Sequence, residues 1–125
     1  MRQVWYDAGV LIAADRCDRS TWADHRTLLD AGITPTTTAP IVAQASRSPE
    51  QAQLRRFLRG CEVVGFDPAD AHLVGDLLHR AKTSDVIDAH LVIAAAVGEV
   101  LMTTDPDDLA HLANLVDDPP RIDPR

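Results

Sequence analysis

One passage near the start of the chain predicts its architecture: Val4-Trp5-Tyr6-Asp7-Ala8-Gly9-Val10-Leu11-Ile12. The first three residues are apolar and indicate a short strand that ends at Asp7, and the residues that follow predict a helix over 8–15. A strand that passes directly into a helix is typical of the β-α-β unit. We therefore expect parallel strands joined by helical crossovers.

The same alternation continues along the chain. Further strands are predicted at 33–37, 62–66, 100–103 and 121–122, and further helices at 21–31, 40–45, 48–58, 68–81, 85–97 and from 106 onward. Crossovers between parallel strands are right-handed, and the helices cover both faces of the sheet. The expected fold is α/β, with three layers (α/β/α), a central parallel sheet of four to five strands, and a single domain over residues 1–125.

The size and composition suit one globular domain. The chain has 125 residues, of which 46% are hydrophobic and 25% charged. Its longest apolar run, 91–98, is too short to cross a bilayer, and no secretion signal precedes the first strand. Cys17 and Cys61 have no metal-ligand spacing and indicate reduced structural thiols. We expect a cytoplasmic protein without a membrane partner.

The acidic side chains are the most informative part of the composition. The formal net charge is −7, and 16 of the 19 acids are aspartates. A net-acidic domain is a poor general binder of nucleic acid, because neutralisation of phosphates drives that affinity. Acting on a nucleic acid would require a local basic patch, a metal ion that offsets the acids, or both.

Three places put aspartates where a parallel sheet binds ligands, beyond the carboxyl ends of its strands. They are Asp7 after the first strand, Asp85 and Asp88 at the start of an apolar helix, and Asp105 with Asp107 after the strand at 100–103. Each has a structural alternative, since an aspartate before a helix is often only its N-cap. Asp67-Pro68-Ala69-Asp70 has the same pattern and is interpreted as capping alone.

Asp88 is the least easily explained by capping. Its neighbours Val86, Ile87, Ala89, Leu91 and Val92 predict a helix buried on most sides. A buried carboxylate is costly unless it is paired or binds a metal, and no lysine or arginine lies near it in the sequence. Several such acids at one sheet edge would share a hard divalent cation, with Mg²⁺ or Mn²⁺ as the candidates.

Three motifs together resemble the PIN-domain ribonucleases of the VapC toxin family, from type II toxin–antitoxin systems. They are the opening passage given above, Asp85-Val86-Ile87-Asp88-Ala89-His90-Leu91-Val92-Ile93-Ala94-Ala95, and Thr103-Thr104-Asp105-Pro106-Asp107-Asp108-Leu109. The resemblance extends from Asp7 to Leu109. It implies a Mg²⁺-dependent endoribonuclease, a toxin that hydrolyses phosphodiester bonds in single-stranded regions of tRNA or rRNA, with Mn²⁺ as a possible alternative metal.

The resemblance also assigns roles to individual residues. Asp7, Asp88 and Asp105 would be the catalytic residues and would hold the metal, with Asp85 and Asp107 in or beside the site. The family usually carries a glutamate where this chain has Gln44, an amide that supplies no charge and no base. Gln44 is therefore a possible neighbour of the site, and it favours an alternative: a PIN-like module that binds RNA or its antitoxin without efficient cleavage.

One basic cluster is a candidate contact for a partner. Arg47, Arg55, Arg56 and Arg59 are predicted to contact RNA phosphates or an acidic segment of an antitoxin, although each taken singly is as well explained as a solvated helix face. The resemblance implies a cognate VapB-type antitoxin and an RNA substrate as partners, and a homodimer.

Overall fold

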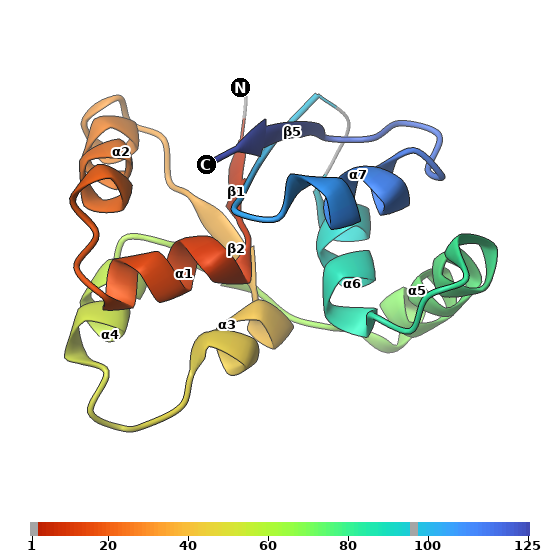
Figure 1. Ribbon diagram of the computed structural model, residues 1–125, viewed down its shortest axis with the longest axis horizontal. Helices are drawn as coiled ribbons and strands as arrows, with labels where there is room; N and C mark the ends of the chain where they lie inside the picture. The colour runs from red at the N-terminus through yellow and green to blue at the C-terminus, as the bar shows by residue number, and fades with distance from the viewer. Residues whose placement is uncertain (1–2, 96–97) are drawn as a thin grey trace.

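Five parallel strands form one sheet in the computed structural model, which describes residues 3–95 and 98–125 (Figure 1). The strands are β1 (Val4–Tyr6), β2 (Thr36–Thr38), β3 (Glu62–Val64), β4 (Val100–Thr103) and β5 (Arg121–Pro124). Their order across the sheet is β3-β2-β1-β4-β5, and every neighbouring pair is parallel. The expected parallel sheet of four to five strands is confirmed.

Seven helices connect these strands within the described residues. They are α1 (Ala8–Asp15), α2 (Arg19–Asp30), α3 (Ala39–Ala45), α4 (Ala52–Leu58), α5 (Pro68–Ala81), α6 (Val86–Ala94) and α7 (Pro106–Ala113). The predicted helices at 8–15 and 68–81 agree with α1 and α5 at both ends. None of the helices in the described part of the chain is long and apolar enough to cross a membrane.

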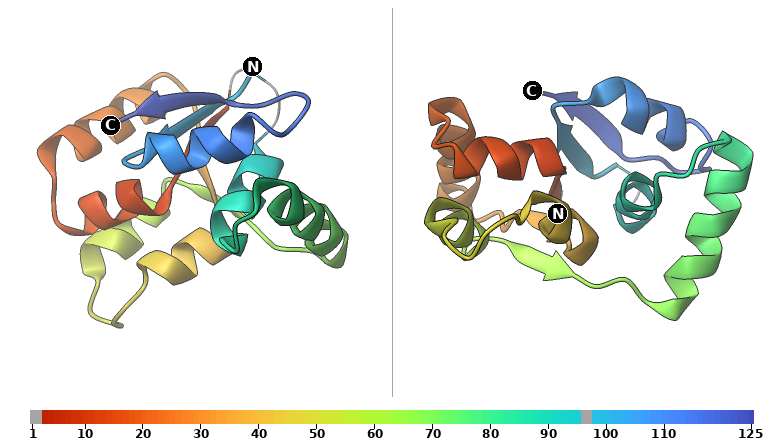
Figure 2. Two further views of the ribbon diagram at one scale, coloured as in Figure 1. Left: turned by 45° about the vertical axis from the view of Figure 1, so that its right-hand side comes forward. Right: turned by 60° about the horizontal axis from the view of Figure 1, so that its bottom comes forward.

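The strand order contains a reversal that defines where a ligand can bind. From β1 the chain moves through β2 to the edge strand β3, and it then returns to the other side of β1 to form β4 and β5. Right-handed crossovers in opposite directions place their helices on opposite faces. Accordingly α1 packs against α2, α3 and α4, whereas α5 packs against α6 and α7 (Figure 2). The crevice beyond the ends of β1 and β4 is the switch point at which such sheets bind ligands.

The boundaries differ from the predictions mainly where side chains bind the backbone. The helix predicted from residue 48 begins instead at Ala52. The side-chain amide oxygen of Gln51 accepts hydrogen bonds from the backbone N–H groups of Arg47 and Ser48 and holds these residues in a loop. The helix predicted at 85–97 ends at Ala94, after which the backbone of Ala95 is extended. Its predicted final residue, Val97, lies outside the described residues.

The hydrophobic core lies on both sides of β1 and β4. Fully buried residues come from nearly every element, among them Leu11, Ile41, Phe57, Leu77, Leu91, Leu101 and Leu109. Strand β2 is unusual because it consists of three buried threonines, whose hydroxyls are used in hydrogen bonds. Thr37 donates to the Tyr6 carbonyl at 2.9 Å and so ties β2 to β1, which satisfies a polar group that burial would otherwise penalise.

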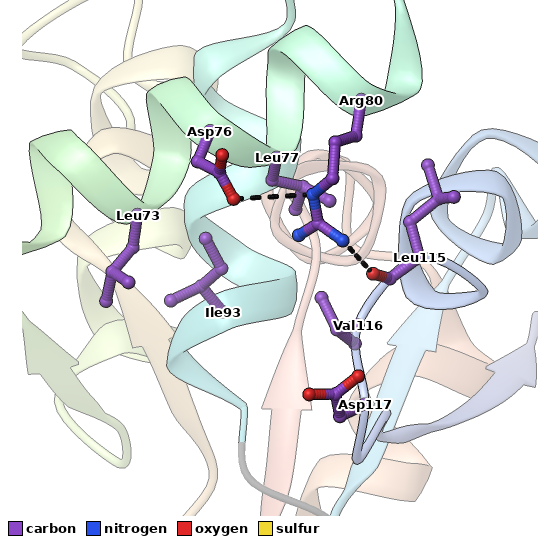
Figure 3. A pocket seen from close by; sticks show the side chains of 8 residues that line it. All are labelled: Leu73, Asp76, Leu77, Arg80, Ile93, Leu115, Val116 and Asp117. Carbon is purple, nitrogen blue, oxygen red and sulfur yellow. Dashed lines mark hydrogen bonds and ion pairs between the residues drawn. The ribbon is translucent and has the colours of Figure 1, made fainter.

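Arg80 on α5 joins this helix to the segment that follows α7. Arg80 on α5 donates from one guanidinium nitrogen to the Leu115 carbonyl at 2.7 Å, and a second nitrogen lies 3.3 Å from the Asp76 carboxylate (Figure 3). The surrounding hollow measures about 170 Å³. Because Arg80 is already bound on two sides, its role here is to join α5 to the segment that follows α7.

The loop after β4 lies directly against the start of α1. A Cβ atom on Gly9 would fall 1.7 Å from the Thr104 hydroxyl oxygen and 2.9 Å from the Thr104 Cβ. No side chain fits in that space, so glycine at this position permits the close approach. The contact brings the residues that follow β4 next to the residues that follow β1.

Gly9→Ala should therefore destabilise the protein, although alanine is the better helix former. Displacing the Thr104 loop is expected to cost about 1 to 3 kcal/mol of the free energy of unfolding, measured by urea denaturation. Gly75→Ala is the matched control, because Gly75 lies in α5 with nothing within 4 Å of an added Cβ. The control should gain up to about 1 kcal/mol from helix propensity. Equal stability changes in the two variants would contradict the close contact at Gly9.

Candidate functional site

Asp7 is held rigidly at the junction of β1 and α1. It is 6% exposed, and its carboxylate accepts hydrogen bonds from the Ala8 backbone N–H at 2.6 Å and from the Thr103 hydroxyl at 2.5 Å. The first bond caps the helix, and the second joins the end of β1 to the end of β4. Asp7 therefore has the structural role that the capping alternative predicted, and it also lies at the switch point of the sheet.

Asp85 and Asp88 lie together at the start of α6. Asp85 is the N-cap, and its carboxylate accepts from the Asp88 backbone N–H at 3.0 Å. The pKa of Asp88 is raised from 3.8 to about 7, first by burial, next by the charge of Asp85 and a hydrogen bond between the two carboxyl groups, and then by the charges of Asp7 and Asp105. Asp88 is thus the point at which the acids from three parts of the chain interact.

Asp105 enters the same group from the end of β4. Its backbone N–H donates to the Thr103 hydroxyl at 2.8 Å, and its side chain is exposed to solvent. The pKa of Asp105 is raised chiefly by a hydrogen bond between its carboxyl group and that of Asp108, with smaller effects from burial and from the charges of Asp108, Asp7 and Asp107. Asp107, the fifth predicted acid, is exposed and influences Asp105 least.

A small acidic pocket of about 180 Å³ lies between the start of α6 and one side of α7. Its lining residues are Thr83, Asp85, Asp88, Asp108, His111 and Leu112. His111 is hydrogen-bonded through Nε2 to the Ala81 carbonyl at 3.0 Å. Asp85 and Asp88 therefore face one common space, as their spacing on the helix predicts. None of the ion pairs formed among the described residues involves Asp7, Asp85, Asp88 or Asp105.

The donor set consists of hard carboxylate oxygens, which are the ligands that Mg²⁺ and Mn²⁺ prefer. Within residues 3–95 and 98–125, no three acidic, histidine or cysteine side chains are already arranged to hold one metal ion. Mg²⁺ keeps several of its waters and is commonly bound through only one or two carboxylates, so a complete protein cage is not required. The chemistry of the residues fits a hard divalent cation, and their present arrangement is an open acidic group.

Thr103 and Asp108 are site residues that the sequence analysis did not identify. Thr103 is fully buried and bridges Asp7 and Asp105 through one hydroxyl group. Asp108 binds Asp105 and lines the pocket with Asp85 and Asp88. The sequence signal for Thr103 is a polar residue at the end of a buried strand. The signal for Asp108 is its position three residues after Asp105, a spacing that brings two side chains together on a helix, whereas Asp107 is only two residues away.

Gln44 and the predicted basic cluster are not among the residues that line the acidic pocket, and neither are Asp7 and Asp105. Gln44 lines a cavity with Ile12 and Arg47. Two of the predicted arginines have contacts within the chain: Arg55 donates to the Pro49 carbonyl, and the Arg56 guanidinium lies 4.5 Å from the ring centroid of Trp22 on α2. Arg59 follows α4 as its exposed C-cap.

Thr103→Val should separate the two central strand ends. Valine keeps the shape but removes one of the two donors to the Asp7 carboxylate and leaves the Asp105 N–H without its acceptor, at a cost of about 1 to 3 kcal/mol. Thr37→Val, which removes one hydroxyl from the same sheet, is the control. Denaturation and the NMR chemical shifts of Asp7 and Asp105 provide the readout. Shifts that stay unchanged in Thr103→Val would show that this hydroxyl does not organise the site.

The raised pKa of Asp88 predicts how stability depends on pH. An aspartate whose folded pKa is about 7 binds more protons in the folded than in the unfolded state between 3.8 and about 7, so stability falls as pH rises through this window. Asp88→Asn stays neutral. Its melting temperature in EDTA should exceed that of the parent by a margin that grows from about pH 5 to about pH 8.

The control for this measurement is Asp30→Asn, at the exposed end of α2, where Asp30 lies 3.7 Å from Arg26. This variant should show no comparable growth of the difference with pH, because exposed pairs contribute little. If the difference in melting temperature between Asp88→Asn and the parent stays constant from about pH 5 to about pH 8, Asp88 does not have the raised pKa that the acidic group gives it.

Comparisons with known proteins establish the fold. No family model matches this chain, and a search of curated proteins found no match. A solved structure, the crystal structure of VapBC2 from Rickettsia felis bound to a DNA fragment from their promoter, contains a chain that matches with a TM-score of 0.69 and 15% sequence identity. The match covers 98% of this chain and 98% of that chain. The protein therefore has the PIN-like fold, with one parallel five-stranded sheet between two groups of helices, that its three acidic motifs predict.

Proposed function

We propose that this protein is a Mg²⁺-dependent or Mn²⁺-dependent endoribonuclease and the toxin of a type II toxin–antitoxin pair. The observation that carries the proposal is the arrangement of aspartates at the switch point of a PIN-like sheet: the Thr103 hydroxyl bridges Asp7 and Asp105, and Asp85 and Asp88 line one pocket at the start of α6. A purely capping role for these residues does not require them to converge, whereas a shared cation does. The structural likeness to the VapBC2 complex supports the same function.

The residues of the site would divide the work. Asp7 and Asp88 would be the principal ligands of the cation, Asp105 would complete the site, and Asp85 and Asp107 would lie in or beside it. A bound divalent cation would neutralise charge that develops on the phosphodiester and lower the pKa of the attacking water. Thr103 holds Asp7 in one orientation through its hydroxyl. With a pKa of about 7, Asp88 is only partly ionised at neutral pH.

A cognate VapB-type antitoxin is the partner that this proposal implies, and a homodimer remains a prediction. The solved neighbour is a VapBC2 assembly on promoter DNA, which supports an antitoxin partner here. All four arginines of the predicted cluster have exposed side chains that an acidic antitoxin segment can reach. Arg47, Arg55 and Arg56 also have contacts within the described chain.

A second candidate function is a PIN-like module that binds RNA or its antitoxin with little cleavage. Two observations favour it. Gln44 replaces the glutamate usual in the resembling family, and no three donors in the described residues form a ready-made metal site. The two candidates differ in whether the purified protein cuts RNA when metal is supplied.

Asp88→Asn should reduce metal-dependent RNA cleavage by at least about a hundredfold. A carboxylate that holds the metal helps to lower the activation barrier by several kcal/mol, and the variant loses that contribution. The test incubates antitoxin-free protein with total RNA, with Mg²⁺, Mn²⁺ or EDTA, and maps the cut ends. Asp30→Asn is the control and should cleave like the parent. A parent that leaves RNA intact with either metal would favour the second candidate, and an Asp88→Asn variant as fast as the parent would remove Asp88 from the site.

A further inference from the structure

A cavity larger than the acidic pocket lies apart from it in the described part of the chain. It measures about 410 Å³, against about 180 Å³ for the acidic pocket, and lies between α1 and the connection from α3 to α4. Its lining residues are Ile12, Asp15, Arg16, Gln44, Ala45, Arg47, Ser48 and Gln51. Its volume falls in the range of small-molecule sites, and nothing derived above assigns it a role.

The two glutamines of this cavity differ in how they are bonded. Gln51 uses its whole amide: its oxygen accepts from the N–H groups of Arg47 and Ser48, and its nitrogen donates to the Asp15 carboxylate at 3.1 Å and the Ala45 carbonyl at 3.0 Å. Gln44, in contrast, has a buried amide oxygen with no hydrogen-bond partner. An orphaned acceptor costs about 1 to 3 kcal/mol, and a ligand that donates to it removes the penalty.

Two arginines make this cavity positive on a chain of net charge −7. Arg16 and Arg47 are exposed, and neither forms any of the ion pairs found in the described residues. Arg47 is held in place because its guanidinium donates to the carbonyls of Ala43 and Ser46. One acid, Asp15, faces them, and one of its oxygens is bonded to Gln51. The lining is therefore suited to anionic groups, unlike the acidic pocket.

The cavity lies within reach of a strand that crosses the acidic group. Asp7 caps the first turn of α1, whereas Ile12 and Asp15 lie five and eight residues further along the same helix. At about 1.5 Å per residue this separation is about 8 to 12 Å. A stacked nucleic-acid strand covers that length in about two to four nucleotides, at roughly 3.4 Å each.

We propose that this cavity binds one unstacked nucleotide of the RNA, with the Gln44 amide on the edge of the base and Arg16 and Arg47 on the flanking phosphates. The inference rests on the proposed function and deepens it by naming the element that selects the cleavage position. An amide both donates and accepts, as a base edge does, and arginine recognises phosphate. Ile12, 36% exposed, offers an apolar surface to the base.

A nucleotide matches both features of the lining. The amino and imino groups of a base carry N–H groups that can donate to Gln44, and its phosphates can accept from Arg16 and Arg47. The carboxylate of an acidic side chain offers only acceptors, so it matches the arginines alone.

The test measures binding of four fluorescein-labelled 2′-O-methyl RNA homopolymers, of about eight nucleotides each, by fluorescence anisotropy in EDTA, so that cleavage does not interfere. The parent should prefer one base over the others by about fivefold or more. Gln44→Leu should abolish that preference while the protein remains folded, because the change removes an orphaned polar group. Gln53→Leu, a glutamine of α4 outside the cavity, is the control and should keep it.

Arg16→Ala should weaken binding of all four homopolymers alike and reduce the salt dependence of binding by about 0.7 in log–log slope. Arg26→Ala, on the exposed face of α2, is its control. Gln44→Glu is a second variant: it preserves the shape but adds a negative charge, and it should also lose the preference. A parent that does not distinguish the four bases, or a Gln44→Leu variant that still does, overturns the proposal.

These outcomes are separable from those of the proposed function. Asp88→Asn should lose cleavage and retain the base preference, because Asp88 lies in the other pocket. If cleavage depends on Asp88 but Gln44→Leu keeps the base preference, the proposed nuclease function stands and the proposed nucleotide site is wrong. A third outcome combines two results: the parent shows no base preference, and an acidic antitoxin peptide binds tightly to both the parent and Gln44→Leu. That outcome would assign the cavity to the peptide and overturn the proposal.

Discussion

The hydrogen bond from the Thr103 hydroxyl to the Asp7 carboxylate joins the ends of the two central strands, and the architecture of the site depends on it. The same hydroxyl accepts from the Asp105 N–H, so one buried oxygen positions two acids. The absence of a side chain at Gly9 allows the loop after β4 to reach that junction. A parallel sheet brings strand ends to one edge, but contacts of this kind decide which side chains meet there.

The acidic group is maintained against its own electrostatic repulsion. Burial and neighbouring carboxylates both disfavour ionisation of Asp88, and its pKa of about 7 expresses that cost. The rest of the fold tolerates it because the core is extensive and the polar groups around the site are bonded: Asp7 caps α1, and Asp85 caps α6. Under the proposed function the same side chains would cap helices and hold a metal, and capping does not exclude that second role.

The distribution of charge answers a difficulty that the composition raises. A chain of net charge −7 repels a polyanion, so RNA needs local attraction. Of the basic residues at 55–59, Arg55 donates to the Pro49 carbonyl and Arg56 lies over Trp22. The structure places Arg16 beside Arg47, around the cavity along α1. The pairing of Arg16 with Arg47 crosses from α1 to the segment after α3, and no local pattern in the sequence announces it.

What the sequence by itself determined were the features set by neighbouring residues: the alternation of strands and helices, the parallel sheet, the exact extent of α1 and α5, and the aspartates at the ends of β1 and β4. Apolar periodicity and capping signals are local, so they can be read without the fold. Start and end points shifted where a side chain bound the backbone a few residues away, as Gln51 does before α4.

Only the tertiary structure decided which distant residues meet. It placed β4 beside β1, brought Thr103 and Asp108 into contact with the predicted aspartates, and placed Gln44 in the lining of a cavity other than the acidic pocket. Such contacts join residues far apart in the chain, as Thr103 and Asp7 are, at 96 positions. Their geometry follows from the packing of whole elements against each other, which depends on burial across the molecule and leaves no signature in any short stretch of sequence.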